Sequence, residues 1–259
     1  MTEQILESRG TIPMSPLSWL IGRRTILAAM ALMLPLPARS QTRTSGETSM
    51  LHVALLGDSV FDNAAYVRGS PDVVQQLRRV LPEGWLATLL AVDGHVISDV
   101  PSQLSRLPSN ATHLVVSVGG NDALRASGVI ERPTRSVAEA LGLLAEVRER
   151  FQSAYGAMLD AVQATACPTA LCTIYDPRYP EPQRRRLTTT ALALLNDVIT
   201  REAFARELSL IDLRVLCNED ADFANPIEPS VEGGQKIAKA IAAFLHERRE
   251  LQGTRVFAR

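Results

Sequence analysis

Five short apolar runs alternate with longer segments of helical character from residue 50 onward. Their hydrophobicity is continuous rather than alternating, so both faces of each strand are expected to be covered, as in a parallel sheet between helices. Strands joined by crossovers of this length predict a doubly wound α/β fold, a three-layer α/β/α sandwich around a five-stranded, mostly parallel sheet. The runs are Leu51–Leu56, Leu86–Val92, Leu114–Val118, Ala170–Tyr175 and Leu208–Leu213.

Four helices are expected around these runs. Asp72 can cap the first, and the segment 137–164 is long and periodic enough for one long helix. Pro229 limits how early the last of them can begin. The expected helices extend from a cap at Asp72 through Leu81, over 137–164, over 182–207, and from Ser230 to about Glu247.

Composition is typical of one medium globular domain. The chain has 259 residues, of which 46% are hydrophobic and 21% charged. We assign residues 50–250 to a single domain and 251–259 to a C-terminal tail. The net charge of −1 and the lack of a basic block interleaved with aromatics make nucleic acid an unexpected partner. Three cysteines without CxxC spacing predict buried free thiols rather than a disulfide framework or a zinc site.

Residues 1–49 have the layout of a bacterial export signal. Arg23 and Arg24 precede a short apolar stretch, and small residues follow near Ala38 and Ser40. The apolar stretch is too short to span a membrane comfortably, and the paired arginines resemble a twin-arginine signal. This interpretation predicts a periplasmic or secreted protein. The alternatives are an unstructured N-terminal extension or an over-extended gene start. If translation starts at Met50, the protein is expected to be cytoplasmic.

Two polar turns follow two of the expected strands. Gly57-Asp58-Ser59 ends the first run, and Gly119-Gly120-Asn121-Asp122 ends the third. The carboxyl ends of parallel strands meet at one edge of the sheet, where open α/β sheets place their active-site crevice. Ser59 is therefore a candidate nucleophile, and the alternative is a serine that caps the next helix. Asp58 is expected to order the turn.

These two motifs resemble those of the GDSL family, also called SGNH hydrolases. The resemblance implies a flavodoxin-like α/β/α fold, a nucleophilic Ser59 and an oxyanion hole. In that hole, Asn121 would donate through its side-chain amide, and the backbone N–H groups of Ser59 and Gly94 would complete the set. Gly94 is assigned by its place after the second strand, in Val92-Asp93-Gly94.

The last motif departs from the family pattern. The family ends in Asp-x-x-His, whereas this chain has Asn225 and Glu228 at those positions. A serine hydrolase needs a base, and an unperturbed glutamate has a pKa about two units below that of histidine. Burial is expected to raise the pKa of Glu228 to about 5 to 6, and the Asn225 amide could orient its carboxylate. The alternative is that Glu228 only caps the last helix or binds another polar group.

Other residues near the expected crevice are weaker candidates. His95, beside Gly94, is the one histidine placed to approach the crevice and could replace Glu228 as the base. Asn63 and Tyr66 follow the nucleophile and could bind substrate, although a tyrosine near a loop is more often half-buried packing. The segment Tyr175–Tyr179, after the fourth strand, is a second candidate wall.

These observations favour an esterase that hydrolyses a small-molecule carboxylic ester, with no metal or organic cofactor. Ser59 would be the nucleophile and Glu228 the unusual base. The alternative is a catalytically impaired protein of the same fold that binds an acyl or sugar ligand without turning it over. The sequence indicates neither the substrate's acyl chain nor the oligomeric state.

Overall fold

A computed structural model describes residues 50–247 and 253–258 of the chain. Its central sheet has six strands in the order β2-β1-β3-β4-β5-β8, and every neighbouring pair is parallel. This topology confirms the doubly wound α/β fold expected from the apolar runs. The strands are β1 (His52–Gly57), β2 (Leu86–Leu89), β3 (His113–Ser117), β4 (Thr169–Cys172), β5 (Ser209–Ile211) and β8 (Val256–Phe257).

The four expected helices are present. Asp72, Ser136 and Ser230 cap three of them by accepting a hydrogen bond from a backbone N–H in the first turn. The longer helices are α1 (Val73–Val80), α4 (Val137–Gln163), α5 (Pro182–Ala205) and α7 (Val231–His246). The shorter ones are α2 (Val100–Leu104), α3 (Gly120–Ala126), α6 (Leu213–Leu216) and the 3₁₀ helices η1 (Ile97–Asp99), η2 (Ser127–Glu131) and η3 (Asp220–Asp222).

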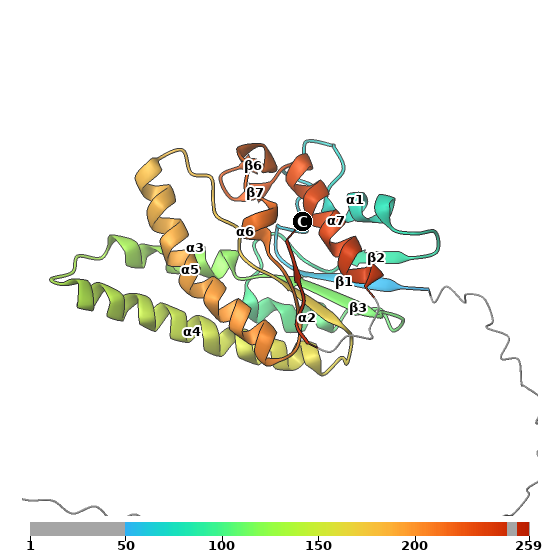
Figure 1. Ribbon diagram of the computed structural model, residues 1–259, viewed down its shortest axis with the longest axis horizontal. Coiled ribbons are helices and arrows are strands. Elements are labelled where there is room, and N and C mark those ends of the chain that lie inside the picture. Colours follow the sequence, from blue (N-terminus) through green and yellow to red (C-terminus); the bar gives the residue numbers. More distant parts are fainter. Residues whose placement is uncertain (1–49, 248–252, 259) are drawn as a thin grey trace, which may run out of the picture. The chain divides into compact units, whose positions relative to one another are not determined.

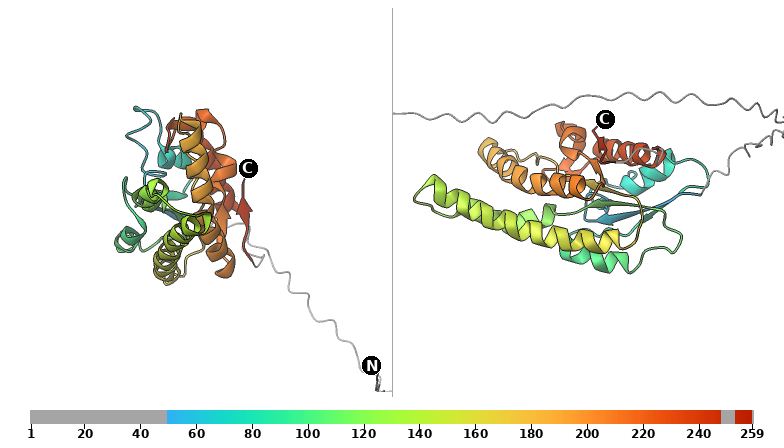
Figure 2. Two further views of the ribbon diagram at one scale, coloured as in Figure 1. Left: turned by 90° about the vertical axis from the view of Figure 1, so that its left-hand side faces the viewer. Right: turned by 60° about the horizontal axis from the view of Figure 1, so that its bottom comes forward.

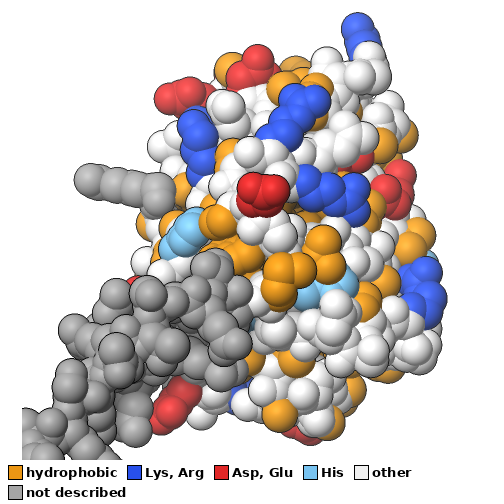
Figure 3. Space-filling view, turned by 90° about the vertical axis from the view of Figure 1, so that its right-hand side faces the viewer, with side chains coloured by type: hydrophobic (Ala, Val, Ile, Leu, Met, Phe, Trp, Pro, Cys, Tyr) orange, Lys and Arg blue, Asp and Glu red, His pale blue; other side chains and the backbone are white. Residues whose placement is uncertain are grey.

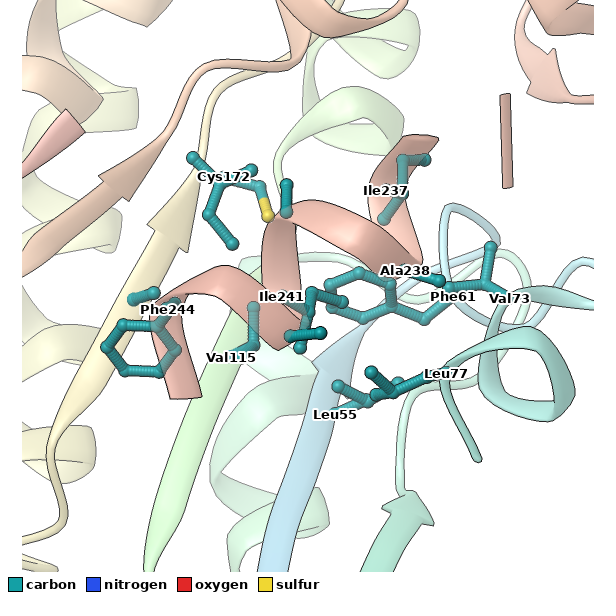
Figure 4. Packing of buried hydrophobic residues seen from close by; sticks show 14 of the residues in the cluster. Leu55, Phe61, Val73, Leu77, Val115, Cys172, Ile237, Ala238, Ile241 and Phe244 are labelled. Carbon is teal, nitrogen blue, oxygen red and sulfur yellow. The ribbon is translucent and has the colours of Figure 1, made fainter. Parts of the chain in front are cut away.

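Helices cover both faces of the sheet (Figures 1 and 2). Successive side chains of β1 point to opposite faces, so Val53 and Leu55 join the core under α1 and α7, while Ala54 and Leu56 join the core under α4 and α5. Figure 4 shows the first of these cores, in which residues from the sheet and from α1 and α7 interdigitate. The continuous apolar character of the run is therefore explained by burial on both sides.

The C-terminal segment corrects the expected strand count. Residues 251–259 were expected to be a tail, but β8 within them adds a sixth parallel strand beside β5. The backbone N–H of Leu210 donates to Arg255 O at 2.6 Å, and that of Asp212 donates to Phe257 O at 2.8 Å. A two-residue strand carries no apolar run, so its pairing is decided by the free edge of β5 rather than by sequence pattern.

A second, two-stranded antiparallel sheet lies apart from the main one. It pairs β6 (Phe223–Asn225) with β7 (Glu228–Pro229) and immediately precedes α7. Neither strand was expected, because each is too short to show a period of two. This hairpin carries Glu228 to the edge of the main sheet where the strands end.

The surface beside β1, α1 and α7 mixes basic, acidic and scattered apolar side chains (Figure 3), in keeping with the net charge of −1. Within residues 50–247 and 253–258, no helix is both long and apolar enough to cross a membrane. The three cysteines are free, and Cys172 and Cys217 are buried. The expected export signal lies outside the described residues.

Candidate active site

The turn after β1 is held tightly against the end of β3. Gly57 has φ of +128°, and a Cβ at this position would lie 1.7 Å from the carbonyl oxygen of Ser117. Only glycine therefore fits here. The backbone N–H of Asp58 donates to the same Ser117 oxygen at 3.1 Å. As a result, Ser59 is fixed at the carboxyl edge of the sheet, with 6% of its surface exposed.

Ser59 is paired directly with Glu228. The Ser59 hydroxyl donates to Glu228 Oε1 at 3.1 Å, and Glu228 is itself buried, with 6% of its surface exposed. No helix begins at Ser59, so the serine does not act as a helix cap. The structure therefore brings together the two residues that the sequence offered as nucleophile and base.

The Glu228 carboxylate is held through the backbone of its hairpin. Asn225 Oδ1 accepts hydrogen bonds from the N–H groups of Ile227 at 3.0 Å and Glu228 at 3.1 Å. Asn225 thus shapes the turn through its side-chain oxygen. We had expected its amide to donate to the Glu228 carboxylate, and the structure shows these backbone contacts instead. Tyr175 donates its hydroxyl to Ile227 O at 2.5 Å from the neighbouring loop. Within the described residues, Glu228 Oε2 has no hydrogen-bond partner.

The start of α7 fixes the other end of the hairpin. Ser230 caps this helix through its bond from the Gly233 N–H at 3.2 Å, so Glu228 is not the cap. The buried Asp222 accepts a hydrogen bond from Lys236 at 2.9 Å and, through its carbonyl, one from the Ser230 N–H at 2.8 Å. These contacts leave Glu228 little freedom to move away from Ser59.

Two buried carboxyl groups in the site have raised pKa values. Burial raises the pKa of Glu228 to about 7, the hydrogen bond from Ser59 opposes this rise, and the nearby negative charge of Asp93 adds to it. The expected 5 to 6 was too low because the carboxylate is more fully desolvated than its sequence context suggested. Burial likewise raises the pKa of Asp58 to about 8, although the hydrogen bond that its carboxylate accepts from the Val60 N–H lowers the pKa. Near pH 7, Asp58 therefore keeps its proton while Glu228 titrates.

Asn121 lies across the same edge of the sheet, at the start of α3. Its Nδ2 donates one hydrogen to His95 O at 2.9 Å, which leaves the second hydrogen of the amide for another acceptor. Gly94 precedes His95 in the turn after β2 and has φ of +81°. Within the described residues, the backbone N–H groups of Ser59 and Gly94 donate to no protein acceptor.

Gln103 ties the nucleophile turn to the His95 loop, a role that the sequence did not suggest. It is fully buried, accepts from Gly57 N–H at 2.7 Å and donates to Gly57 O at 2.7 Å. Its Nε2 also lies 2.9 Å from His95 Nδ1. The ring of His95 is thus engaged with Gln103, whereas the hydroxyl of Ser59 is paired with Glu228. A lone glutamine in a five-residue helix gives no recognisable sequence signal.

Asn63 and Tyr66 lie to one side of the catalytic pair. Asn63 is fully buried, donates to Pro229 O at 3.2 Å and accepts from the Val73 N–H at 3.0 Å. Tyr66 donates its hydroxyl to Asp93 at 2.8 Å. These contacts give Asn63 a structural role, and the substrate-binding role of both residues stays a prediction.

A pocket of about 630 Å³ reaches the catalytic pair. Its lining includes Ser59, Glu228 and Asn121, and it continues past Tyr175 and Tyr179 of the loop after β4, the expected second wall. Asn63 and Tyr66 are not among the residues that line it. In the part of the chain described, no group of three or more His, Cys, Asp or Glu side chains is arranged to hold a metal ion.

The chain matches the GDSL-like Lipase/Acylhydrolase family over residues 55–236. It belongs to this family. The match spans all four candidate positions, Ser59, Gly94, Asn121 and Glu228, so the departure at Glu228 lies inside the family domain. A search of curated protein sequences finds no significant match.

Solved structures of esterases and a phospholipase share this fold at low sequence identity. A phospholipase A1 from Streptomyces albidoflavus NA297 is 16% identical, with a TM-score of 0.55 over 77% of this chain and 100% of that one. The esterase EstA from Pseudoalteromonas sp., in a structure inhibited by monoethylphosphonate, is 17% identical. Its TM-score is 0.52, and the match covers 76% of this chain and 99% of EstA. An acetyl xylan esterase from Geobacillus stearothermophilus is 16% identical. Its TM-score is 0.53, and the match covers 76% of this chain and 94% of the esterase. These similarities confirm the three-layer fold.

Proposed function

We propose that this protein hydrolyses carboxylic esters through a Ser59–Glu228 catalytic pair. The observation that carries the proposal is the hydrogen bond from the Ser59 hydroxyl to Glu228 Oε1 at 3.1 Å, formed beside an open pocket. Membership in an acylhydrolase family supports ester hydrolysis as the reaction class. The raised pKa of Glu228, about 7, makes this carboxylate a stronger base than an ordinary glutamate.

In the first half of the reaction, Ser59 Oγ attacks the carbonyl carbon of the ester while its proton passes to Glu228 Oε1. The negative charge that develops on the carbonyl oxygen is stabilised by donors already in place. We assign these donors to the backbone N–H groups of Ser59 and Gly94 and to the free hydrogen of the Asn121 amide. The ester C–O bond then breaks, and Glu228 returns the proton to the departing alkoxide.

In the second half, water replaces the alcohol. Glu228 accepts a proton from the water as its oxygen attacks the acyl-enzyme carbonyl. Collapse of the tetrahedral intermediate breaks the bond to Ser59 Oγ, which regains the proton from Glu228. A carboxylate can serve in both halves because it is ionised before each attack and protonated before each departure. Within the described residues no donor stabilises the ionised carboxylate at Glu228 Oε2, which keeps the group basic.

The experiment is covalent labelling with a fluorophosphonate, which reacts only with an activated serine. We expect a single adduct by intact mass, located on the peptide that contains Ser59, and none in Ser59→Ala. Ser117, a buried serine that also lines the pocket, gives a matched control as Ser117→Ala, which should still be labelled. A protein that binds acyl ligands without turnover would show no adduct at all.

A further inference from the structure

The pocket beside the catalytic pair is lined mainly by helices on one side of the fold. It extends from Ser59 between α3 with η2, α4 and α5, and the first turns of α4 and α5 reach beyond the carboxyl ends of the strands (Figures 1 and 2). Apolar side chains from all of these elements line it. They include Leu124, Val129, Leu144, Val147, Leu187 and Leu195.

The polar residues of this lining fall into two groups. Asp58, Ser59, Ser117, Thr173 and Glu228 are buried where the strands end, at the catalytic pair. Glu131, Glu181 and Arg184 line the pocket but are exposed to solvent. Leucines of α5 lie deeper, since Leu192 is 6% exposed and Leu195 is 5% exposed. A sugar would need several polar groups converging on it inside the pocket. Away from the catalytic pair, the walls formed by α3, η2, α4 and α5 offer mostly aliphatic side chains, so this part of the pocket suits an apolar group.

Two leucines of the lining are exposed to water. Leu124 is 38% exposed and Leu187 is 40% exposed, from α3 and α5. A ligand that lies between these helices would remove apolar surface from water on both of them. The pocket's 630 Å³ falls within the range of about 300–1,000 Å³ that holds a drug-sized ligand. An acetyl group would leave most of this space unfilled.

We propose that this pocket binds the acyl chain of the ester and makes medium- and long-chain acyl esters the preferred substrates. The proposal rests on Ser59 being the nucleophile, because the acyl carbon must lie at Ser59 Oγ while the chain extends between α3, α4 and α5. Each methylene buried there should raise kcat/KM by about fourfold.

The test compares p-nitrophenyl acetate, butyrate, octanoate and laurate. We expect kcat/KM to rise by about 250-fold from butyrate to octanoate in the wild-type protein, because the chain gains four methylenes. Ala191→Phe, which fills the pocket from α5, should remove most of this gain, so that the ratio of kcat/KM for octanoate to that for acetate falls. Ala193→Phe is the matched control on the same helix, because Ala193 is exposed and does not line the pocket.

A second pair of variants avoids any problem with folding. Leu187→Gln places a polar group on the exposed part of the lining and should lower the ratio of laurate to acetate hydrolysis several-fold. Leu141→Gln is its control, since Leu141 is 59% exposed and lies outside the pocket. A rate that stays flat or falls with acyl length in the wild-type protein would overturn the acyl-chain assignment while leaving ester hydrolysis standing.

Binding separates the two proposals if no ester is hydrolysed. Laurate is titrated calorimetrically into Ser59→Ala and into Ser59→Ala with Ala191→Phe. Binding that is lost with Ala191→Phe would support the acyl pocket, and the failed hydrolysis assays alone would count against the hydrolase. Absence of binding to both proteins would contradict the acyl pocket, whatever the hydrolysis assays give.

Discussion

The hydroxyl of Ser59 donates a 3.1 Å hydrogen bond to Glu228, a residue 169 positions later in the chain. The two come from unlike elements, since Ser59 follows a central strand of the main sheet and Glu228 lies in a two-residue strand of a separate hairpin. Asn225 and Tyr175 hold that hairpin through backbone groups rather than through the carboxylate. The carboxylate is therefore positioned by its loop and remains free to exchange a proton with Ser59.

Removal of the Ser59 hydroxyl should abolish ester hydrolysis and preserve the fold. Ser59→Ala deletes the attacking oxygen, and no other hydroxyl in the described contacts is bonded to Glu228. Initial rates with p-nitrophenyl butyrate and a thermal melt by circular dichroism test this expectation. The melt is best recorded near pH 5, where Glu228 is protonated and loses least from the missing hydrogen bond. Activity within a few-fold of the wild-type rate would overturn the nucleophile assignment.

Asn121→Ala should lower kcat by about 10²- to 10³-fold. The free hydrogen of the amide is expected to bond the oxyanion, which exists only in the transition state, so KM should change little. The lost bond to His95 O lies in a half-buried loop and should reduce stability by about 1 kcal/mol. Steady-state kinetics separate the two effects. A rise in KM alone would make Asn121 a substrate-binding residue.

Asp58→Asn should stabilise the protein at alkaline pH. The pKa of Asp58 is raised to about 8, so between about pH 4 and 8 the folded state holds a proton that the unfolded state has lost. The wild-type protein therefore loses stability as pH rises through this window. The variant escapes this loss, and its advantage should grow from near zero at pH 4 by at most about 1.4 kcal/mol per pH unit. Urea titrations at pH 4.5, 6 and 8 measure it, and an advantage that does not vary with pH would contradict the assignment.

Asp93→Asn should move the acidic limb of the rate profile to lower pH. The charge of Asp93 raises the pKa of Glu228, so its removal lets Glu228 ionise more readily. Glu83→Gln removes an exposed carboxylate of the same sign and serves as the control. We expect a shift of less than about one pH unit for Asp93→Asn and none for Glu83→Gln. An upward shift, or an equal shift in both variants, would show that Asp93 does not act on the base through its charge.

The long elements of the fold could be predicted from the sequence, because burial on both faces of β1 and the caps at Asp72 and Ser230 leave clear patterns. The short elements could not. The two residues of β8 and the two of β7 form because of what lies beside them, and such contacts leave no periodicity.

The same division holds in the site. The pairing of Ser59 with Glu228 followed from the family frame of the two motifs. The role of Gln103 could not be predicted from the sequence, because its hydrogen bonds to Gly57 and His95 depend on how α2 packs against the turn. The pKa of Glu228 was placed too low for a related reason, since desolvation depends on neighbours that the local sequence does not reveal.

The most direct test of the Ser59–Glu228 pair is the pH–rate profile of the wild-type protein beside those of Glu228→Gln and His95→Ala. A carboxylate base acts when ionised, so wild-type kcat/KM should rise through about pH 7 and then level off. That midpoint lies close to an ordinary imidazole pKa of about 6.5, and so the variants decide the assignment. We expect Glu228→Gln to lose at least about 10²-fold in rate and His95→Ala to keep the wild-type midpoint. An active Glu228→Gln beside an inactive His95→Ala would show that His95, and not Glu228, takes the proton from Ser59.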